Sequence, residues 1–153
     1  MSAEANVAEL GIRLPPAGAP KGLYQPAVIV GNLLYTSGHL PAADDGTLIT
    51  GRLGADLSEA AGAEAARRAG LAILATLRAT LGSLDRVRRV VKILGVVQCT
   101  PEFTKQPLVI NGCSQLLAEV FGVEAGVGAR SALGTSALPL GAAVEIEAVF
   151  EID

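Results

Sequence analysis

The stretch "GARSALGTSALPLGAAVEIEAV", residues 128–149, decides the fold and raises the question of function. A run of small and apolar residues over 131–138 predicts one strand, and residues 143–152 predict a second. Arg130 stands at the head of the first strand, and Glu145 lies on the second. A permanent positive charge there is either a solvated strand end or the fixed cation of a pocket for an anionic ligand. The rest of the chain has to distinguish these alternatives.

Strand character recurs upstream of this stretch. From Pro26, "PAVIVGNLLYTSG" predicts two strands joined at Gly31-Asn32, a residue pair that favours a tight hairpin. Residues 48–50 predict a short strand in the loop that follows. The β-branched segment "VRRVVKILGVVQC", residues 87–99, predicts a long strand.

Two segments have the spacing of amphipathic helices. The first is expected to begin after Ser58 as its N-cap and to end before Gly82. The second is expected to begin after Thr104 as its N-cap and to end before Gly122. Apolar residues form a stripe on each helix: Ala66, Ala69, Ile73, Leu74, Leu77 and Leu81 on the first, and Val109, Cys113, Leu116, Leu117 and Val120 on the second.

The order of the elements predicts the architecture. Strands that gather into one mixed sheet, with both helices packed on one face, make a two-layer α+β domain. We expect a single domain over residues 1–153. Residues 1–20 form an N-terminal extension, with a short helix followed by a proline-rich extended segment.

Composition limits the classes of function. Hydrophobic residues make up 50% of the 153 residues, yet no uninterrupted apolar run approaches the ~18 residues of a membrane helix. A single soluble chain with this many hydrophobic residues would leave some of them exposed. The composition therefore predicts a homo-oligomer that buries these residues between subunits. A net charge of -3 and only 3% aromatic residues make nucleic-acid binding an unfavourable interpretation. With two cysteines, no C-x-x-C motif and no signal-peptide pattern, a cytoplasmic location is expected.

Several familiar chemistries find no support. His39 is the only histidine and lies two residues from Ser37, but no G-x-S-x-G motif surrounds them, so we expect a surface or loop histidine. One histidine and two separated cysteines make no metal site, and no P-loop or Rossmann fingerprint is present. We therefore expect no metal and no cofactor. Cys113 lies on an apolar helical stripe and is predicted to be a core residue.

What remains is a small set of polar residues at predicted strand ends. Arginine binds carboxylates through two parallel charge-assisted hydrogen bonds, and a glutamate can orient or deprotonate a water molecule. Arg130 and Glu145, on adjoining strands, could equally form a structural ion pair. The remaining members of the set are Tyr24, Ser37 and Asn111.

The chain resembles the RidA/YjgF/YER057c/UK114 family, whose members also carry the label endoribonuclease L-PSP. The similarity runs in order from about Tyr24 to the C-terminus. It rests on "GNLLYTSGHLP", "VRRVVKILGVV" and "VINGCSQLLAEVFG", and most specifically on "ARSALGTSALP" followed by "VEIEAV". The resemblance implies a chorismate-mutase-like α+β subunit that assembles into a homotrimer with clefts between subunits.

The resemblance also implies an activity that uses no cofactor. Family members hydrolyse reactive enamine and imine intermediates, such as 2-aminoacrylate and 2-iminopropanoate, to a 2-keto acid and ammonia. By motif position, Arg130 would bind the substrate carboxylate and Glu145 would hold the attacking water. The same comparison places four residues along the cleft: Tyr24, Ser37, Gly38 and Asn111.

Some features depart from the family pattern. Ala132 stands where members often have a cysteine, and His39 stands where many have glutamine. The N-terminal extension and the segment 44–57 make the chain longer than a typical member. Two alternatives stay open: a trimer that binds small carboxylates or metabolites without catalysis, and a ribonuclease, against which the acidic composition counts.

Overall fold

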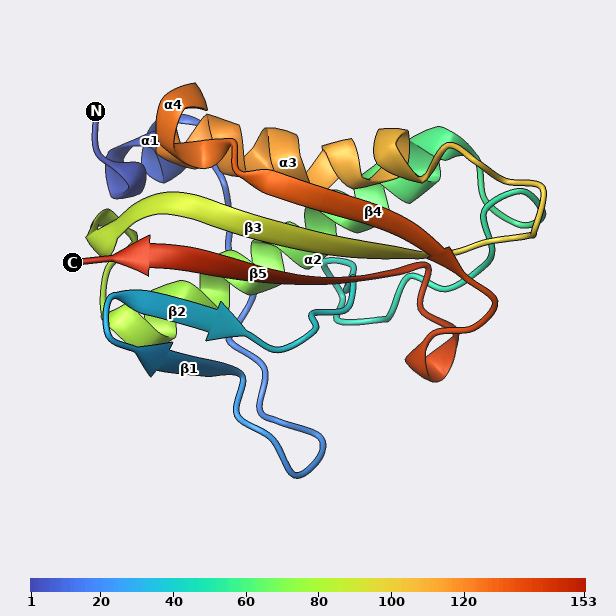
Figure 1. The fold of residues 1–153 in the computed structure, drawn as a ribbon, viewed down its shortest axis with the longest axis horizontal. Helices are drawn as coiled ribbons and strands as arrows, with labels where there is room; N and C mark the ends of the chain where they lie inside the picture. Colours follow the sequence, from blue (N-terminus) through green and yellow to red (C-terminus); the bar gives the residue numbers. More distant parts are fainter.

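A five-stranded mixed sheet forms the centre of the computed structural model, which describes residues 1–153 (Figure 1). The strand order is β1-β2-β5-β3-β4, with β3 and β4 parallel and all other neighbours antiparallel. The strands are β1 (Ala27–Val30), β2 (Leu33–Thr36), β3 (Val87–Gln98), β4 (Ala129–Thr135) and β5 (Val144–Ile152). The predicted hairpin over β1 and β2 is confirmed, with Gly31 at φ 62° in its turn.

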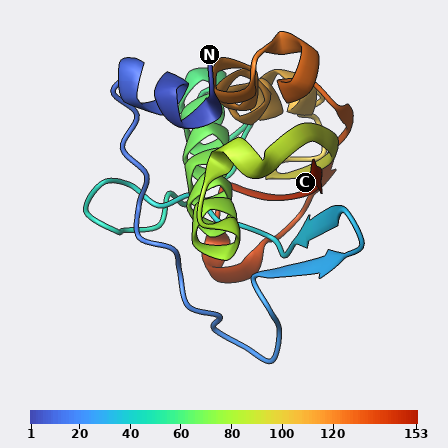
Figure 2. The same ribbon diagram turned by 90° about the vertical axis from the view of Figure 1, so that its left-hand side faces the viewer.

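Two long helices cover one face of this sheet, so the predicted two-layer α+β fold is confirmed. Helix α2 (Glu59–Leu81) and helix α3 (Gln106–Phe121) lie side by side on one side of the strands (Figure 2). The predicted helical stripes are buried, and they pack against the alternate residues of β5 that point toward the helices: Val144, Ile146, Ala148, Phe150 and Ile152. No helix has the length and apolar character needed to span a membrane.

The ends of α2 are those that the sequence predicts. Ser58 Oγ accepts a hydrogen bond from the Ala61 backbone N–H at 3.1 Å, and Gly82 adopts the left-handed conformation at φ 84°. The N-cap prediction for α3 is wrong. Lys105 precedes that helix and Thr104 caps nothing, because Pro107 in the first turn has a preset φ and no N–H to satisfy.

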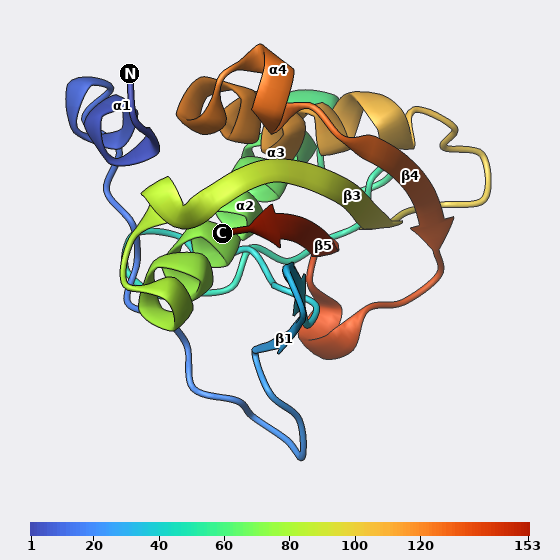
Figure 3. The ribbon, with the colours of Figure 1, turned by 60° about the vertical axis from the view of Figure 1, so that its left-hand side comes forward.

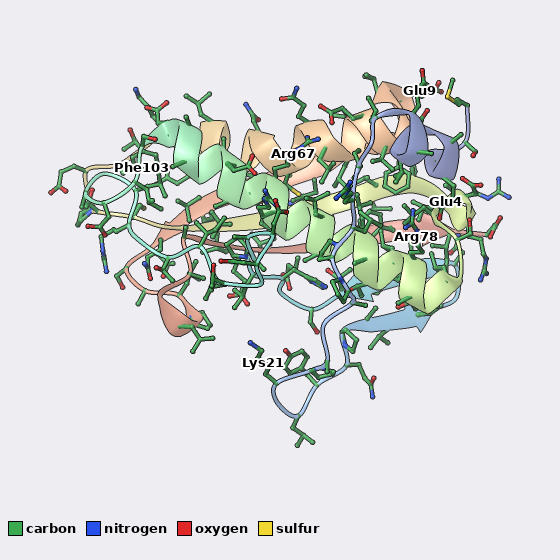
Figure 4. The ribbon with its side chains drawn as sticks, turned by 180° about the vertical axis from the view of Figure 1, so that it is seen from behind. Glu4, Glu9, Lys21, Arg67, Arg78 and Phe103 are labelled. Carbon is green, nitrogen blue, oxygen red and sulfur yellow. The ribbon has the colours of Figure 1, made fainter.

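The N-terminal extension is anchored to the domain. Helix α1 (Ala3–Glu9) is the predicted short helix, and Asn6 donates a side-chain hydrogen bond to the Val120 carbonyl at 2.8 Å. Glu4 accepts hydrogen bonds from Arg78 and from the Leu84 N–H, at 2.9 Å for the latter. The proline-rich segment then crosses the outer side of α2 and reaches a loop at Lys21 (Figure 4).

Three local expectations differ from the structure. The predicted strand 48–50 is only a pair of isolated bridges, from Leu48 to Ala42 and from Thr50 to Ala142, because the loop returns alongside the sheet without joining it. Strand β4 ends at Thr135, three residues early, since the chain then turns through Pro139–Gly141. A short helix, α4 (Val123–Gly126), was not predicted.

The other face of the sheet has no covering element within the chain. Apolar side chains on this open face include Val30, 63% exposed, and Leu133, 55% exposed. Val28 and Tyr35 are paired across β1 and β2 and are also exposed. Apolar surface of this extent is typical of an interaction face.

Candidate functional site

Arg130 lies on β4, the edge strand of the sheet, and points toward the helices. It is in register with Ile93, whose side chain is buried in the core beneath α3. The Arg130 Nη1 donates to Asn111 Oδ1 at 2.7 Å and to Ser114 Oγ at 3.1 Å. No carboxylate forms an ion pair with it, and its Nε and Nη2 donate to no group of the chain. The guanidinium is therefore held in place by neutral oxygens, with three of its five N–H donors available.

Helix α3 supplies both partners of this arginine from one face. Asn111 and Ser114 are three residues apart, a spacing that places side chains next to each other on a helix. Asn111 was among the residues predicted from the sequence, whereas Ser114 was not. The signal was present in "NGCS", because the i, i+3 spacing puts the hydroxyl beside the amide.

Cys113, between these two residues, points the other way, into the core. It is fully buried, and this burial raises the pKa of its thiol to about 12, with a smaller opposing effect from the Arg130 charge. A thiol with such a pKa stays protonated and is a poor nucleophile. The prediction that Cys113 is a core residue is confirmed.

Glu145 lies on β5 and points to the open face of the sheet. It is paired with Val96 and lines a hollow of about 250 Å³ with Gly38, Leu94, Val96 and Glu147. Burial raises the pKa of the Glu145 carboxyl, and the negative charge of Glu147 raises it further. A carboxylate with a raised pKa is a stronger proton acceptor than an ordinary glutamate.

Gly38 is the residue that lets Glu145 occupy this position. A Cβ at Gly38 would collide with the Glu145 carboxylate, with its Cδ at 2.8 Å and Cγ at 2.9 Å, closer than side-chain contacts permit. Only glycine fits here without displacing the carboxylate. Two of the residues singled out from the sequence are thus in direct contact.

His39 fixes the segment that contains Gly38. Its backbone exchanges two hydrogen bonds with Ile146, at 2.8 and 3.1 Å, which places the segment beside β5. Its Nδ1 donates to the Ser37 carbonyl at 2.7 Å, so the neutral ring accepts at Nε2 from the Thr76 hydroxyl at 2.8 Å. Burial lowers the pKa of His39, which favours this neutral form.

This geometry bears on the two expectations for His39. His39 lies in the connection between β2 and α2, as expected of a loop residue, but it is partly buried and both ring nitrogens are hydrogen-bonded. The ring contacts the Ser37 carbonyl, while the Ser37 hydroxyl donates to the Gln25 carbonyl at 2.5 Å. Ser37 and His39 therefore do not form the nucleophile and base of a hydrolase triad. This agrees with the sequence, in which no G-x-S-x-G motif surrounds them.

The site residues form two groups that one chain does not bring together. Arg130 and Asn111 lie on the helix-facing side of the sheet edge, whereas Glu145 and Gly38 lie on the open face. Strand β3 lies between β4 and β5, so the strands of Arg130 and Glu145 do not adjoin as the sequence analysis supposed (Figure 3). The alternative interpretation, a structural ion pair between Arg130 and Glu145 of one chain, is accordingly wrong.

The remaining predicted cleft residues belong to the Glu145 group. Tyr24, Ser37 and Gly38 line a second cavity, of about 280 Å³, next to the hollow of Glu145. No cluster of three or more histidine, cysteine, aspartate or glutamate residues suited to a metal ion occurs. The available chemistry is an anion-binding guanidinium, amide and hydroxyl groups, and a carboxylate able to accept a proton.

The sheet, its two helices and the arginine at the sheet edge define a chorismate-mutase-like α+β fold with a guanidinium that has no ion-pair partner. A sequence profile described as "YjgF/chorismate_mutase-like, putative endoribonuclease" matches residues 4–151. The chain belongs to this family, and the resemblance to RidA/YjgF proteins is confirmed. It is 47% identical to protein TCP17 of Trypanosoma cruzi over 149 residues, which are 97% of this chain and 93% of that protein.

Solved structures show the same fold. The protein Atu1372 of Agrobacterium tumefaciens, described as of unknown function, is 45% identical, with a TM-score of 0.89 over 99% of this chain and 94% of that one. A protein of Shewanella oneidensis, described as a "putative endoribonuclease", is 33% identical. Its TM-score is 0.94, over 99% of this chain and 100% of that one. RidA from an Antarctic Psychrobacter is 28% identical, with a TM-score of 0.62 over 89% and 94%.

Proposed function

We propose that this protein is an enamine/imine deaminase, which hydrolyses reactive 2-imino acids such as 2-iminopropanoate to a 2-keto acid and ammonia. The observation that supports this most strongly is the state of Arg130. Its guanidinium is oriented by Asn111 and Ser114, has no carboxylate partner, and keeps one edge of its fork for a ligand. A planar fork of this kind suits a substrate carboxylate.

The active site is formed between subunits of a homotrimer. Arg130 and Asn111 of one subunit meet Glu145 and Gly38 of its neighbour across the cleft. Two features support this arrangement: the two groups lie on different sides of the sheet, and the open face of the sheet is apolar and uncovered. A closed ring with threefold symmetry uses the same interface three times and leaves none unpaired.

The reaction then needs few groups. Arg130 binds the carboxylate, and Glu145 holds a water molecule against the imine carbon and accepts its proton. The water oxygen bonds to that carbon as the C=N π electrons move to nitrogen, which gives a tetrahedral carbinolamine. Glu145 returns this proton to the nitrogen, then accepts the proton of the new hydroxyl and passes it to the nitrogen as well. The C–N bond breaks as the C=O bond forms, so ammonia leaves and the keto acid remains. Positioning supplies most of the acceleration.

A coupled assay tests this proposal. A serine dehydratase that uses pyridoxal phosphate releases 2-aminoacrylate, which tautomerises to the imine, and the appearance of pyruvate is followed with and without the protein. We expect the wild type to accelerate pyruvate release and Arg130→Ala to match the rate without protein. A wild type that adds nothing to the uncatalysed rate would show that the proposal is wrong.

The alternative of a carboxylate-binding protein without catalysis is separated by a second variant. Under the deaminase proposal, Glu145→Gln abolishes turnover but leaves the affinity for pyruvate largely unchanged, because Arg130 still binds the carboxylate. Calorimetry with pyruvate measures that affinity. If wild type and Glu145→Gln bind pyruvate equally and neither hydrolyses imines, the protein is a binder.

A further inference from the structure

The cavity of about 280 Å³ beside Gly38 lies where the N-terminal extension meets the connection between β2 and α2. One wall is the proline-rich segment 15–21 of the N-terminal extension, and the other is the loop 40–48. Ala72 and Thr76 of α2 lie at its inner end. Most of its apolar lining consists of Pro15, Pro16, Pro20, Pro26, Leu40 and Leu140.

The polar groups at the inner end of this cavity are already satisfied within the protein, whereas the exposed Lys21 also lines it. The His39 ring and the Thr76 hydroxyl bond to each other, and the Ser37 hydroxyl donates to the Gln25 carbonyl. No buried side-chain nitrogen or oxygen in the chain lacks a partner. An apolar group that enters the cavity therefore leaves no buried polar atom without a hydrogen bond. A polar group that enters it meets no buried side-chain donor or acceptor that is free to bind it.

The cavity adjoins the proposed reaction centre. Gly38 lines both this cavity and the hollow that contains Glu145, and the Glu145 carboxylate lies against the Gly38 Cα. A molecule whose reacting carbon faces Glu145 thus has the cavity next to it. Its volume of about 280 Å³ exceeds the roughly 150 Å³ that accommodates a benzene ring in a protein core.

We infer that this cavity receives the substrate side chain, and that the substrates are 2-imino acids with large apolar side chains, such as those derived from leucine or phenylalanine. This inference rests on the proposed function and narrows it. The carboxylate binds Arg130 of the neighbouring subunit, the imine carbon faces Glu145, and the side chain passes Gly38 into the cavity. Such imines are supplied by enzymes that oxidise an amino acid by two electrons at its amino-bearing carbon.

The test compares two imines of different size. A flavin-dependent amino-acid oxidase converts leucine or alanine to the 2-imino acid while O₂ is reduced to hydrogen peroxide, and trapping with semicarbazide reports how much imine survives. Each buried methylene is worth a factor of about four. We therefore expect kcat/KM for the leucine-derived imine to exceed that for the alanine-derived imine by about tenfold or more.

A cavity-filling variant locates the preference. Ala72→Phe places a ring in the cavity and is expected to lower kcat/KM for the leucine-derived imine about tenfold, while the alanine-derived imine changes less than about twofold. Ala79→Phe, on an exposed position of the same helix and outside the cavity, is the matched control and should change neither. Equal kcat/KM values for the two imines in the wild type, or equal losses in both variants, would overturn the inference.

Failure of the inference is distinguishable from failure of the proposed function. If the wild type accelerates no imine, calorimetry compares 4-methyl-2-oxopentanoate with pyruvate, which carry the same two side chains on unreactive keto acids. Tighter binding of the larger acid that is lost in Ala72→Phe supports the cavity assignment even without catalysis. Equal affinities, or binding of neither acid, contradict it.

Discussion

At the scale of single residues, the proposed chemistry depends on a cation and a carboxylate whose surroundings differ. Arg130 is oriented by neutral oxygens, whereas Glu145 is partly desolvated and has Glu147 beside it. The sequence predicted both residues, since their chemistry is evident from type and motif. It did not predict which side of the sheet each faces, because that depends on β3 lying between their strands, and strand order follows from long-range pairing.

The contact between Gly38 and Glu145 gives the first prediction. Gly38→Ala adds a Cβ that collides with the carboxylate, so Glu145 must move, and we expect at least a tenfold loss of kcat. Ala79→Val, at an exposed position of α2 outside both cavities, is the control and should leave kcat unchanged. Thermal unfolding followed by circular dichroism checks that both variants fold. Full activity in folded Gly38→Ala would show that the position of Glu145 is unimportant.

A second prediction concerns pH. Glu145 must be ionised to accept a proton, so activity falls as pH decreases through its raised pKa. Glu147→Gln removes a negative charge that disfavours ionisation of Glu145, which lowers that pKa. The acidic limb of the kcat profile should therefore shift to lower pH in this variant. A limb that stays in place, or moves to higher pH, would mean that another group controls the reaction.

At the scale of elements, sequence signals that act over a few residues predicted the structure correctly, whereas features that depend on long-range contacts were predicted wrongly. The helices, their apolar stripes and the hairpin were predicted because periodicity, caps and turn residues act over a few positions. The strand expected at residues 48–50 and the length of β4 were wrong, since both depend on which neighbour the backbone meets. The contribution of Ser114 depends on the packing of α3 against the edge strand.

The two helix starts provide a matched pair of variants. Ser58→Ala removes the hydroxyl that accepts the Ala61 N–H, and we expect it to lower the free energy of unfolding by about 1 kcal/mol. Thr104→Ala, at the cap predicted wrongly from sequence, should change that free energy by less than about 0.5 kcal/mol. Urea denaturation measures both values. Equal losses in the two variants would contradict the cap assignment.

At the scale of the whole molecule, the apolar open face and the divided site point to the same assembly. One chain exposes large apolar residues on the sheet and holds its cation and its carboxylate on different sides. Composition predicted association but not the surface responsible, because the sequence does not show which sheet face the helices leave uncovered. We expect light scattering at micromolar concentration to give three times the 15.5 kDa of one chain.

Mixed trimers test the shared active site most directly. Arg130→Ala and Glu145→Gln, each inactive alone, are expressed together with different affinity tags, and trimers that carry both tags are purified. If each site takes Arg130 from one subunit and Glu145 from its neighbour, random mixing restores about one quarter of the wild-type sites, with somewhat more in the doubly tagged fraction. We expect deaminase activity at that level. Mixed trimers of the correct mass with no activity, from a wild type that is active, would contradict the shared site.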